Sequence, residues 1–147
     1  MQVREIMSGT PACCTPDTSL EDVARMMVEH DCGCIPVVQP GTSRAAGVVT
    51  DRDIVCRVLA QGKNPLEVKA GDCMSQPALT ISADETVDAC CEKMERHLVR
   101  RLVCVDANGD CCGIVAQADV VRATTQAKAA EVVREVSEPT TDSARVH

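Results

Sequence analysis

Apolar residues occur in two kinds of run along this chain, and both kinds appear in each half. One kind has helical spacing, which predicts amphipathic helices that begin at Thr18 or Ser19 and near Thr86. The other kind is continuous and predicts strands. The apolar positions with helical spacing are Leu20, Val23, Ala24, Met27 and Val28 in the first helix, and Val87, Cys90, Cys91 and Met94 in the second.

The continuous runs come in pairs, so they predict two β-hairpins. In the second pair the runs flank Asp106-Ala107-Asn108-Gly109, and Asn-Gly between apolar runs is a strong signal for a tight turn. A short extended piece precedes each helix and a further helix follows each hairpin, which gives the order β-α-β-β-α in each half. The predicted ranges are 12–15, 35–38, 46–50 and 52–60 in the first half, and 79–82, 102–105, 111–115 and 118–128 in the second.

The two halves are copies of one unit, because similar residues recur at a nearly constant separation. Met7-Ser8 recurs 67 residues later as Met74-Ser75, and after a one-residue change in a loop Asp53 recurs as Asp119. We therefore predict an α+β fold built from two tandem repeats that bury a shared face. The predicted boundaries are 1–62 for the first repeat, 63–69 for a linker, 70–128 for the second repeat, and 129–147 for the end of the last helix and a disordered tail.

Charge and composition exclude several classes of protein. The 147 residues carry a formal net charge of −7, which disfavours non-specific binding to nucleic acid or to an anionic membrane. No apolar run approaches the roughly 20 residues that span a bilayer, and the N-terminus lacks the apolar stretch of a signal peptide, so we expect a cytoplasmic protein. Phe, Tyr and Trp are absent, so aliphatic side chains must hold any ligand.

The chain has 11 cysteines, an odd number, and no C-x-x-C pair. Most lie in apolar runs, where a cysteine behaves as a small hydrophobic residue. Zinc sites usually show C-x₂₋₄-C spacing, and neighbouring cysteines in a strand, such as Cys111 and Cys112, point to opposite faces. We therefore predict no metal site and keep a cysteine-based metal or redox sensor as the weaker alternative.

Several segments resemble the CBS (cystathionine-β-synthase) domain family, in the same order in both halves. Gly47-Val48-Val49-Thr50 followed by Asp53 resembles the family signature of a glycine, two apolar residues and a threonine, with an aspartate three positions later. The resemblance covers residues 3 to about 126. The other segments that carry it are Val3–Ser8, Thr15–Asp17, Asp31–Val38 with its Gly-x-x-Pro, Arg100–Asp106 and Gly113–Val115.

The resemblance implies a stand-alone tandem pair, or Bateman module, shaped as a flat disc with pseudo-two-fold symmetry and two clefts between the repeats. Members of the family bind AMP, ADP, ATP, S-adenosylmethionine or related adenosine derivatives. They regulate an attached or partner protein, and two discs often stack as a homodimer. The implied function is therefore regulatory ligand binding that signals by a conformational shift to a partner that the sequence does not name; no cofactor is required.

Thr50 and Asp53 are the leading candidate ligand residues. Thr50 would place a hydroxyl at a helix N-terminus, which favours anions, and Asp53 would face the same cleft and accept from both ribose hydroxyls. Alternatively, Thr50 caps the helix and Asp53 completes a capping box. In the second repeat Ala116 replaces the threonine although Asp119 remains, so we expect one competent cleft and one that is weaker or empty.

The remaining candidate ligand residues come from the strands. Arg100 and Arg101 are adjacent on a strand, so their side chains should diverge, and one could reach a phosphate or simply be solvated. Where the family commonly has a proline matching Pro36, the second repeat has Val103. We expect an adenine slot, or alternatively only core, to be formed by Gly33, Cys34, Ile35, Pro36, Ala12 and Cys13.

Two further classes of function are alternatives to ligand sensing. A structural dimerisation module with vestigial clefts is favoured by the missing hydroxyl at Ala116 and disfavoured by the intact pair Thr50 and Asp53. An enzyme is least expected, because the chain has no nucleophile–base constellation, no set of metal ligands and no glycine-rich phosphate loop.

Overall fold

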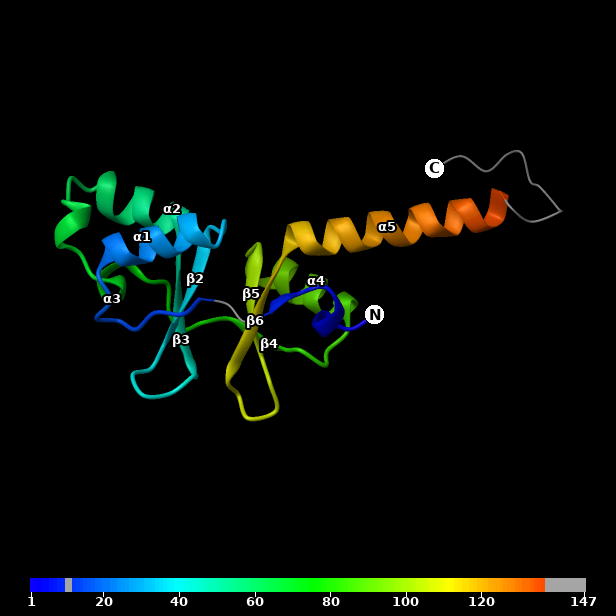
Figure 1. The fold of residues 1–147 in the computed structure, drawn as a ribbon, viewed down its shortest axis with the longest axis horizontal. Helices are drawn as coiled ribbons and strands as arrows, with labels where there is room; N and C mark the ends of the chain where they lie inside the picture. Colours follow the sequence, from blue (N-terminus) through cyan, green and yellow to red (C-terminus); the bar gives the residue numbers. More distant parts are fainter. Residues whose placement is uncertain (10–11, 137–147) are drawn as a thin grey trace.

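A computed structural model describes residues 1–9 and 12–136 of the chain. The sequence predicts the end of the last helix and a disordered tail over 129–147, and residues 137–147 of that segment lie outside the described residues. Figure 1 shows two lobes that lie side by side, each with a β-hairpin and helices, and a long C-terminal helix that extends beyond the second lobe.

The first repeat forms the predicted helix and hairpin. Helix α1 (Leu20–Glu29) begins after Ser19, whose side chain accepts a hydrogen bond from the Asp22 amide. Strands β2 (Cys34–Val38) and β3 (Ala45–Thr50) pair antiparallel. The helix expected at 52–60 is a short α2 (Asp51–Asp53) that continues as the π-helix η2 (Ile54–Leu59).

The second repeat follows the same order. Its elements are β4 (Thr80–Ser82), α4 (Val87–His97) capped by Thr86, β5 (Arg101–Val105), β6 (Cys111–Ala116) and α5 (Gln117–Val136). In the β5–β6 turn only Gly109 has a positive φ, at 82°, although asparagine at position 108 also tolerates that conformation. Helix α5 is longer than the predicted 118–128, because no proline or glycine interrupts the sequence before Val136.

The two sheets have matching strand orders. In the second repeat the order is β1 (Ser8–Gly9), β6, β5 and β4, with β4 parallel to β5 and the other pairs antiparallel. In the first repeat β2 and β3 are flanked by single bridges, which join Cys14 in parallel to Val37 and Ser75 antiparallel to Val48. The predicted α+β fold with pseudo-two-fold symmetry is confirmed.

Each repeat lends its leading segment to the other. Val3, in the 3₁₀ helix η1 (Val3–Glu5), is buried in the core of the second repeat, whereas Ala70 and Cys73, in α3 (Ala70–Cys73), are buried in the core of the first. The 3₁₀ helix η3 (Pro65–Glu67) lies just before α3 and contacts α1. The repeats are therefore interlocked, and each core is completed by residues that stand next to the other repeat in sequence.

Two glycines permit this crossing. A Cβ on Gly47 would lie 2.5 Å from the Ser75 carbonyl oxygen, and one on Gly113 would lie 2.6 Å from that of Ser8. Any side chain at either glycine would push the crossing segment away from the hairpin. Within the described residues, no helix is long and apolar enough to cross a membrane.

Candidate functional site

Two clefts lie between the repeats. The larger cleft has a volume of about 770 Å³, and the smaller cleft about 330 Å³. The larger cleft is lined by Cys34, Val48, Thr50, Asp51, Arg52, Ser75, Pro77, Leu79 and residues 98–103. The smaller cleft is lined by Ser8, Gly9, Ala12, residues 30–34, Arg101, Ile114, Ala116 and Asp119.

The clefts occupy corresponding positions in the pseudo-symmetric fold. Each combines the strand–helix junction of one repeat with the leading segment and the first hairpin strand of the other. Thr50 in the larger cleft therefore corresponds to Ala116 in the smaller one, and Arg100 and Arg101 correspond to Gly33 and Cys34. Asp31 and Leu98, which precede these strands in the two repeats, share a left-handed backbone, with φ of 49° and 53°.

Thr50 and Asp53 form a capping box at the start of α2. The Asp53 amide donates to the Thr50 hydroxyl over 3.1 Å, and the Thr50 amide donates to the Asp53 carboxylate over 3.0 Å. The alternative helix-capping role is therefore confirmed. Because Thr50 also lines the larger cleft, its hydroxyl still stands at the rim of the expected ligand space.

Contrary to the expectation from the sequence, Asp53 does not face the larger cleft. Asp53 is 9% exposed and does not line the cleft. Besides the Thr50 amide, its carboxylate accepts from the Ser75 hydroxyl at 3.3 Å and lies 3.7 Å from the Arg57 guanidinium. Asp53 thus ties α2 to the segment that leads into the second repeat, and the acid that lines the cleft is Asp51 instead.

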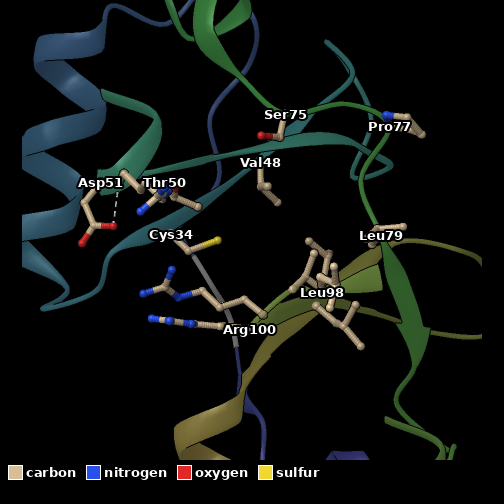
Figure 2. A pocket seen from close by; sticks show the side chains of 14 residues that line it. Cys34, Val48, Thr50, Asp51, Ser75, Pro77, Leu79, Leu98 and Arg100 are labelled. Carbon is tan, nitrogen blue, oxygen red and sulfur yellow. Dashed lines mark hydrogen bonds between the residues drawn. The ribbon is translucent and has the colours of Figure 1, made fainter. Parts of the chain in front are cut away.

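The larger cleft has a polar end and an apolar end, as Figure 2 shows. Thr50 and Asp51 lie at one end, and the Arg100 guanidinium extends toward the same end, below Cys34. Leu79 and Leu98 lie at the opposite end, with Val48 between the two. An apolar wall beside hydroxyl and guanidinium donors suits a ligand that carries a ring system and an anionic group.

Within the described part of the chain, three arginines line the larger cleft against one carboxylate. Arg52, Arg100 and Arg101 contribute positive charge, and Asp51 contributes the negative charge. Arg100 and Arg101 both line this cleft, and Arg101 lines the smaller one as well. Sequence reasoning missed Arg52 as a cleft residue, although its place two residues after Thr50 was a usable signal.

The structure divides the residues of the expected adenine slot among three places. Ala12 and Gly33 line the smaller cleft with Asp119, and Cys34 lines both clefts. Ile35 and Pro36 are fully buried core residues. Cys13 lines neither cleft and contacts Cys111 of the second repeat. The sequence gives no sign of this division, because either repeat could supply the strand that faces Thr50.

Among the described residues, the smaller cleft has no counterpart of the Thr50 hydroxyl or of the Arg100 guanidinium. Ala116 leaves only its amide, which donates to Asp119 over 2.8 Å, and Asp119 also forms an ion pair with Arg122. His30, at the end of α1, lines this cleft, whereas its counterpart His97 ends α4 and lines neither. One positive side chain, Arg101, therefore faces two carboxylates, Asp31 and Asp119, which disfavours an anionic ligand.

Cys34 stands between the clefts as a neutral thiol. Burial raises its pKa to about 12, and the nearby Arg101 guanidinium only partly opposes that rise. Within residues 1–9 and 12–136, no group of three or more His, Cys, Asp or Glu side chains is arranged to hold a metal ion.

Comparison with known proteins identifies the family of this chain. A CBS domain model matches residues 3–60 and 70–125. Protein MK0525 of Methanopyrus kandleri is 38% identical over 119 residues, which span 81% of this chain and 58% of that protein. Hypoxic response protein 1 of Mycobacterium tuberculosis is 30% identical over 136 residues, which span 92% of this chain and 94% of that protein.

Solved structures show the same fold. The CBS domain pair of protein MJ0100, in complex with 5′-methylthioadenosine and S-adenosylmethionine, has a TM-score of 0.77 at 25% identity, covering 86% of this chain and 98% of that one. CBSX2 in complex with AMP has a TM-score of 0.71 at 26% identity, with the same coverage. Hypoxic Response Protein I, with two coordinated zinc ions, has a TM-score of 0.73 at 32% identity, covering 83% of this chain and 98% of that one. This chain belongs to the CBS domain family and contains two CBS repeats.

Proposed function

We propose that the chain is a regulatory module that binds an adenosine phosphate in the larger cleft. Relatives of this fold bind AMP, or S-adenosylmethionine with 5′-methylthioadenosine, so an adenosine ligand agrees with the family. The choice of a phosphate rests on the excess of arginine in the larger cleft. In the described part of the chain, Arg52, Arg100 and Arg101 line this cleft with a single carboxylate, Asp51. Phosphates pair with guanidinium groups, whereas the sulfonium of S-adenosylmethionine is repelled by them.

The proposed placement follows the two ends of the cleft. The adenine would lie at the apolar end against Leu79 and Leu98, and the phosphates would lie near Thr50 and Arg100. The Thr50 hydroxyl already accepts from Asp53, and its own proton remains available to a phosphate oxygen. The smaller cleft would bind such a ligand more weakly, because Ala116 supplies no hydroxyl.

Thermal unfolding with AMP, ADP, ATP and S-adenosylmethionine tests the proposal. A phosphate ligand at 100 times its Kd should stabilise the fold by about 2.7 kcal/mol. Arg100→Gln should weaken binding by about tenfold, because it removes one charge-assisted hydrogen bond. Arg96→Gln is the matched control: it removes the same charge from α4, outside both clefts, and should leave affinity unchanged.

Other outcomes contradict the proposal in distinct ways. Preferential stabilisation by S-adenosylmethionine would contradict the assignment of a phosphate. No stabilisation by any of the four compounds would favour the structural dimerisation module with vestigial clefts. Equal losses in Arg100→Gln and Arg96→Gln would place binding outside the larger cleft.

We further propose that ligand binding signals through the relative placement of the repeats, in a homodimer, to a regulated partner protein. A ligand that contacts both repeats favours one arrangement over others, which a partner can read. Dimer formation is supported by exposed apolar side chains on the helices of the first repeat, Val28, Val55 and Leu59. Sedimentation of Val55→Glu against the unsubstituted chain tests dimerisation, since a buried charge should dissociate a dimer.

All eleven cysteines are thiols, which suits the reducing cytoplasm.

A further inference from the structure

Two cysteines from opposite repeats meet beside the crossing of the N-terminal segment. Strand β1 runs antiparallel to β6, with Gly9 opposite Gly113, so β1 points toward Cys111, the first residue of β6. Cys13 follows four residues after Gly9, and its thiol lies close enough to the Cys111 thiol for the two to interact as hydrogen-bond partners. Both side chains are half-buried, whereas the neighbouring Cys14 is buried.

The Cys111 side of this contact is held by the hairpin of the first repeat. The Cys111 amide donates to the Ser43 carbonyl oxygen over 2.8 Å, and Arg44 and Asp110 form a backbone bridge. On the other side, the Cys14 amide donates to the Pro36 carbonyl oxygen over 3.0 Å. Backbone contacts between and within the repeats therefore hold both thiol-bearing segments in place.

The fold does not require sulfur at these positions. By the repeat offsets, Cys13 corresponds to Thr80 and Cys111 corresponds to Ala45. The other half of the molecule thus builds the same backbone with a hydroxyl and a methyl group. The presence of two thiols at this contact calls for an explanation other than packing.

We propose that Cys13 and Cys111 form an oxidisable dithiol, which a low-molecular-weight disulfide converts into a disulfide bond between the two repeats. The Cys13 thiolate attacks one sulfur of the small disulfide, so that a mixed disulfide forms and one small thiolate leaves. Cys111 then gives up its proton and attacks the Cys13 sulfur, and the second small thiolate leaves. The protein loses two protons and two electrons, which the small disulfide takes up as it is reduced to two thiols.

The environment of the pair suits this order of attack. The hydrogen bond from Cys111 lowers the pKa of Cys13 to about 7, so a large part of Cys13 is thiolate near neutral pH. The same hydrogen bond raises the pKa of Cys111, which keeps it as the proton donor. Cys14, next to Cys13, has a pKa raised to about 11 by burial, so it does not compete as a nucleophile.

The disulfide would act on the wall of the smaller cleft. Ser8, Gly9 and Ala12 line that cleft, and Cys13 is the next residue. A covalent link from Cys13 to the start of β6 would hold this segment against the second repeat. Oxidation would therefore fix the crossing of the repeats without altering a residue that lines either cleft.

The test treats the full-length reduced chain with oxidised glutathione, blocks remaining thiols by alkylation, and maps disulfide-linked peptides by mass spectrometry. We expect an intramolecular link between Cys13 and Cys111. Cys13→Thr and Cys111→Ala, which introduce the residues of the related repeat, should each abolish it. Cys112→Ala is the matched control, since it removes a neighbouring thiol and should leave the link intact.

A link that persists in Cys13→Thr, or oxidation that stops at mixed disulfides, would overturn the proposal. Circular dichroism first checks that each variant is folded. The rate of Cys13 alkylation is then measured as a function of pH. In the unsubstituted chain the rate should reach half of its maximum near pH 7, and Cys111→Ala should shift that point toward the ordinary value of 9.0. An unshifted profile would show that the two thiols do not interact.

Discussion

The two clefts share one backbone plan but differ in the side chains that line them. The larger cleft presents the Thr50 hydroxyl and guanidinium groups from Arg100 and Arg101, whereas the corresponding positions of the smaller cleft are Ala116, Gly33 and Cys34. Duplication therefore copied the geometry of the site without fixing its chemistry. A few substitutions at the rim are enough to make one cleft suited to an anion and the other not.

The cores differ much less than the clefts. Buried thiols lie in both cores: Cys14, Cys34 and Cys73 in the first, and Cys90 and Cys104 in the second. Each repeat also admits the crossing segment over a glycine, Gly47 or Gly113. Substitutions in the cores should therefore act alike in both halves, and substitutions at the strand–helix junctions should not.

The largest expected effect is alkaline destabilisation of both cores. Among the five core thiols, burial raises the pKa of Cys14 and Cys90 from 9.0 to about 11, and that of Cys34 and Cys104 to about 12. Between pH 9 and 11 these thiols ionise in the unfolded chain but stay protonated in the folded one. The free energy of unfolding should therefore fall steeply as pH rises through this window.

Urea unfolding at a series of pH values measures this slope. Cys104→Val should reduce it, because one thiol that ionises only in the unfolded chain is gone. Cys56→Val, at an exposed position, should not change it. Cys13 acts in the opposite sense between pH 7 and 9, because its folded pKa is lowered and its contribution grows as pH rises. A flat profile above pH 9 would show that the core thiols ionise in the folded state.

An intermediate effect is expected at the crossing points. Gly47→Ala and Gly113→Ala should each lower the free energy of unfolding by about 1–3 kcal/mol, because the added methyl group meets a backbone carbonyl that cannot move without displacing a segment. Gly9→Ala is the control, since no heavy atom lies within 4 Å of its added Cβ. Chemical unfolding measures the free energy of unfolding of the three variants. Unequal losses in Gly47→Ala and Gly113→Ala would show that the two crossings are not equivalent.

The smallest effect is expected at the helix caps, and its sign should differ between the halves. Thr50→Val removes the side-chain acceptor of the Asp53 amide and should destabilise the fold by about 1 kcal/mol. Ala116→Thr supplies the missing acceptor at the start of α5 and should stabilise it by a similar amount. Thermal melting of both variants measures the two shifts, and a destabilised Ala116→Thr would mean that the smaller cleft has no room for the hydroxyl.

Local structure followed from the sequence wherever adjacent residues decide it. The caps at Ser19 and Thr86 and the turn at Gly109 were predicted, because a cap or a turn is formed by residues a few positions apart. The π-helical continuation at Ile54–Leu59 was not predicted, since apolar spacing does not distinguish it from an α-helix.

The sequence by itself determined that two like units exist, that each has the order β-α-β-β-α, and that only the first carries Thr50. The tertiary structure alone decided which unit supplies each wall of a cleft. It brought Thr50 to Arg100 instead of Gly33, buried Asp53 against Ser75, and carried Val3 into the other core. The physical reason is that the two repeats have nearly the same pattern of apolar and polar residues. Packing within a repeat and packing across repeats would therefore bury the apolar residues equally well. Only the three-dimensional exchange of the leading segments distinguishes them.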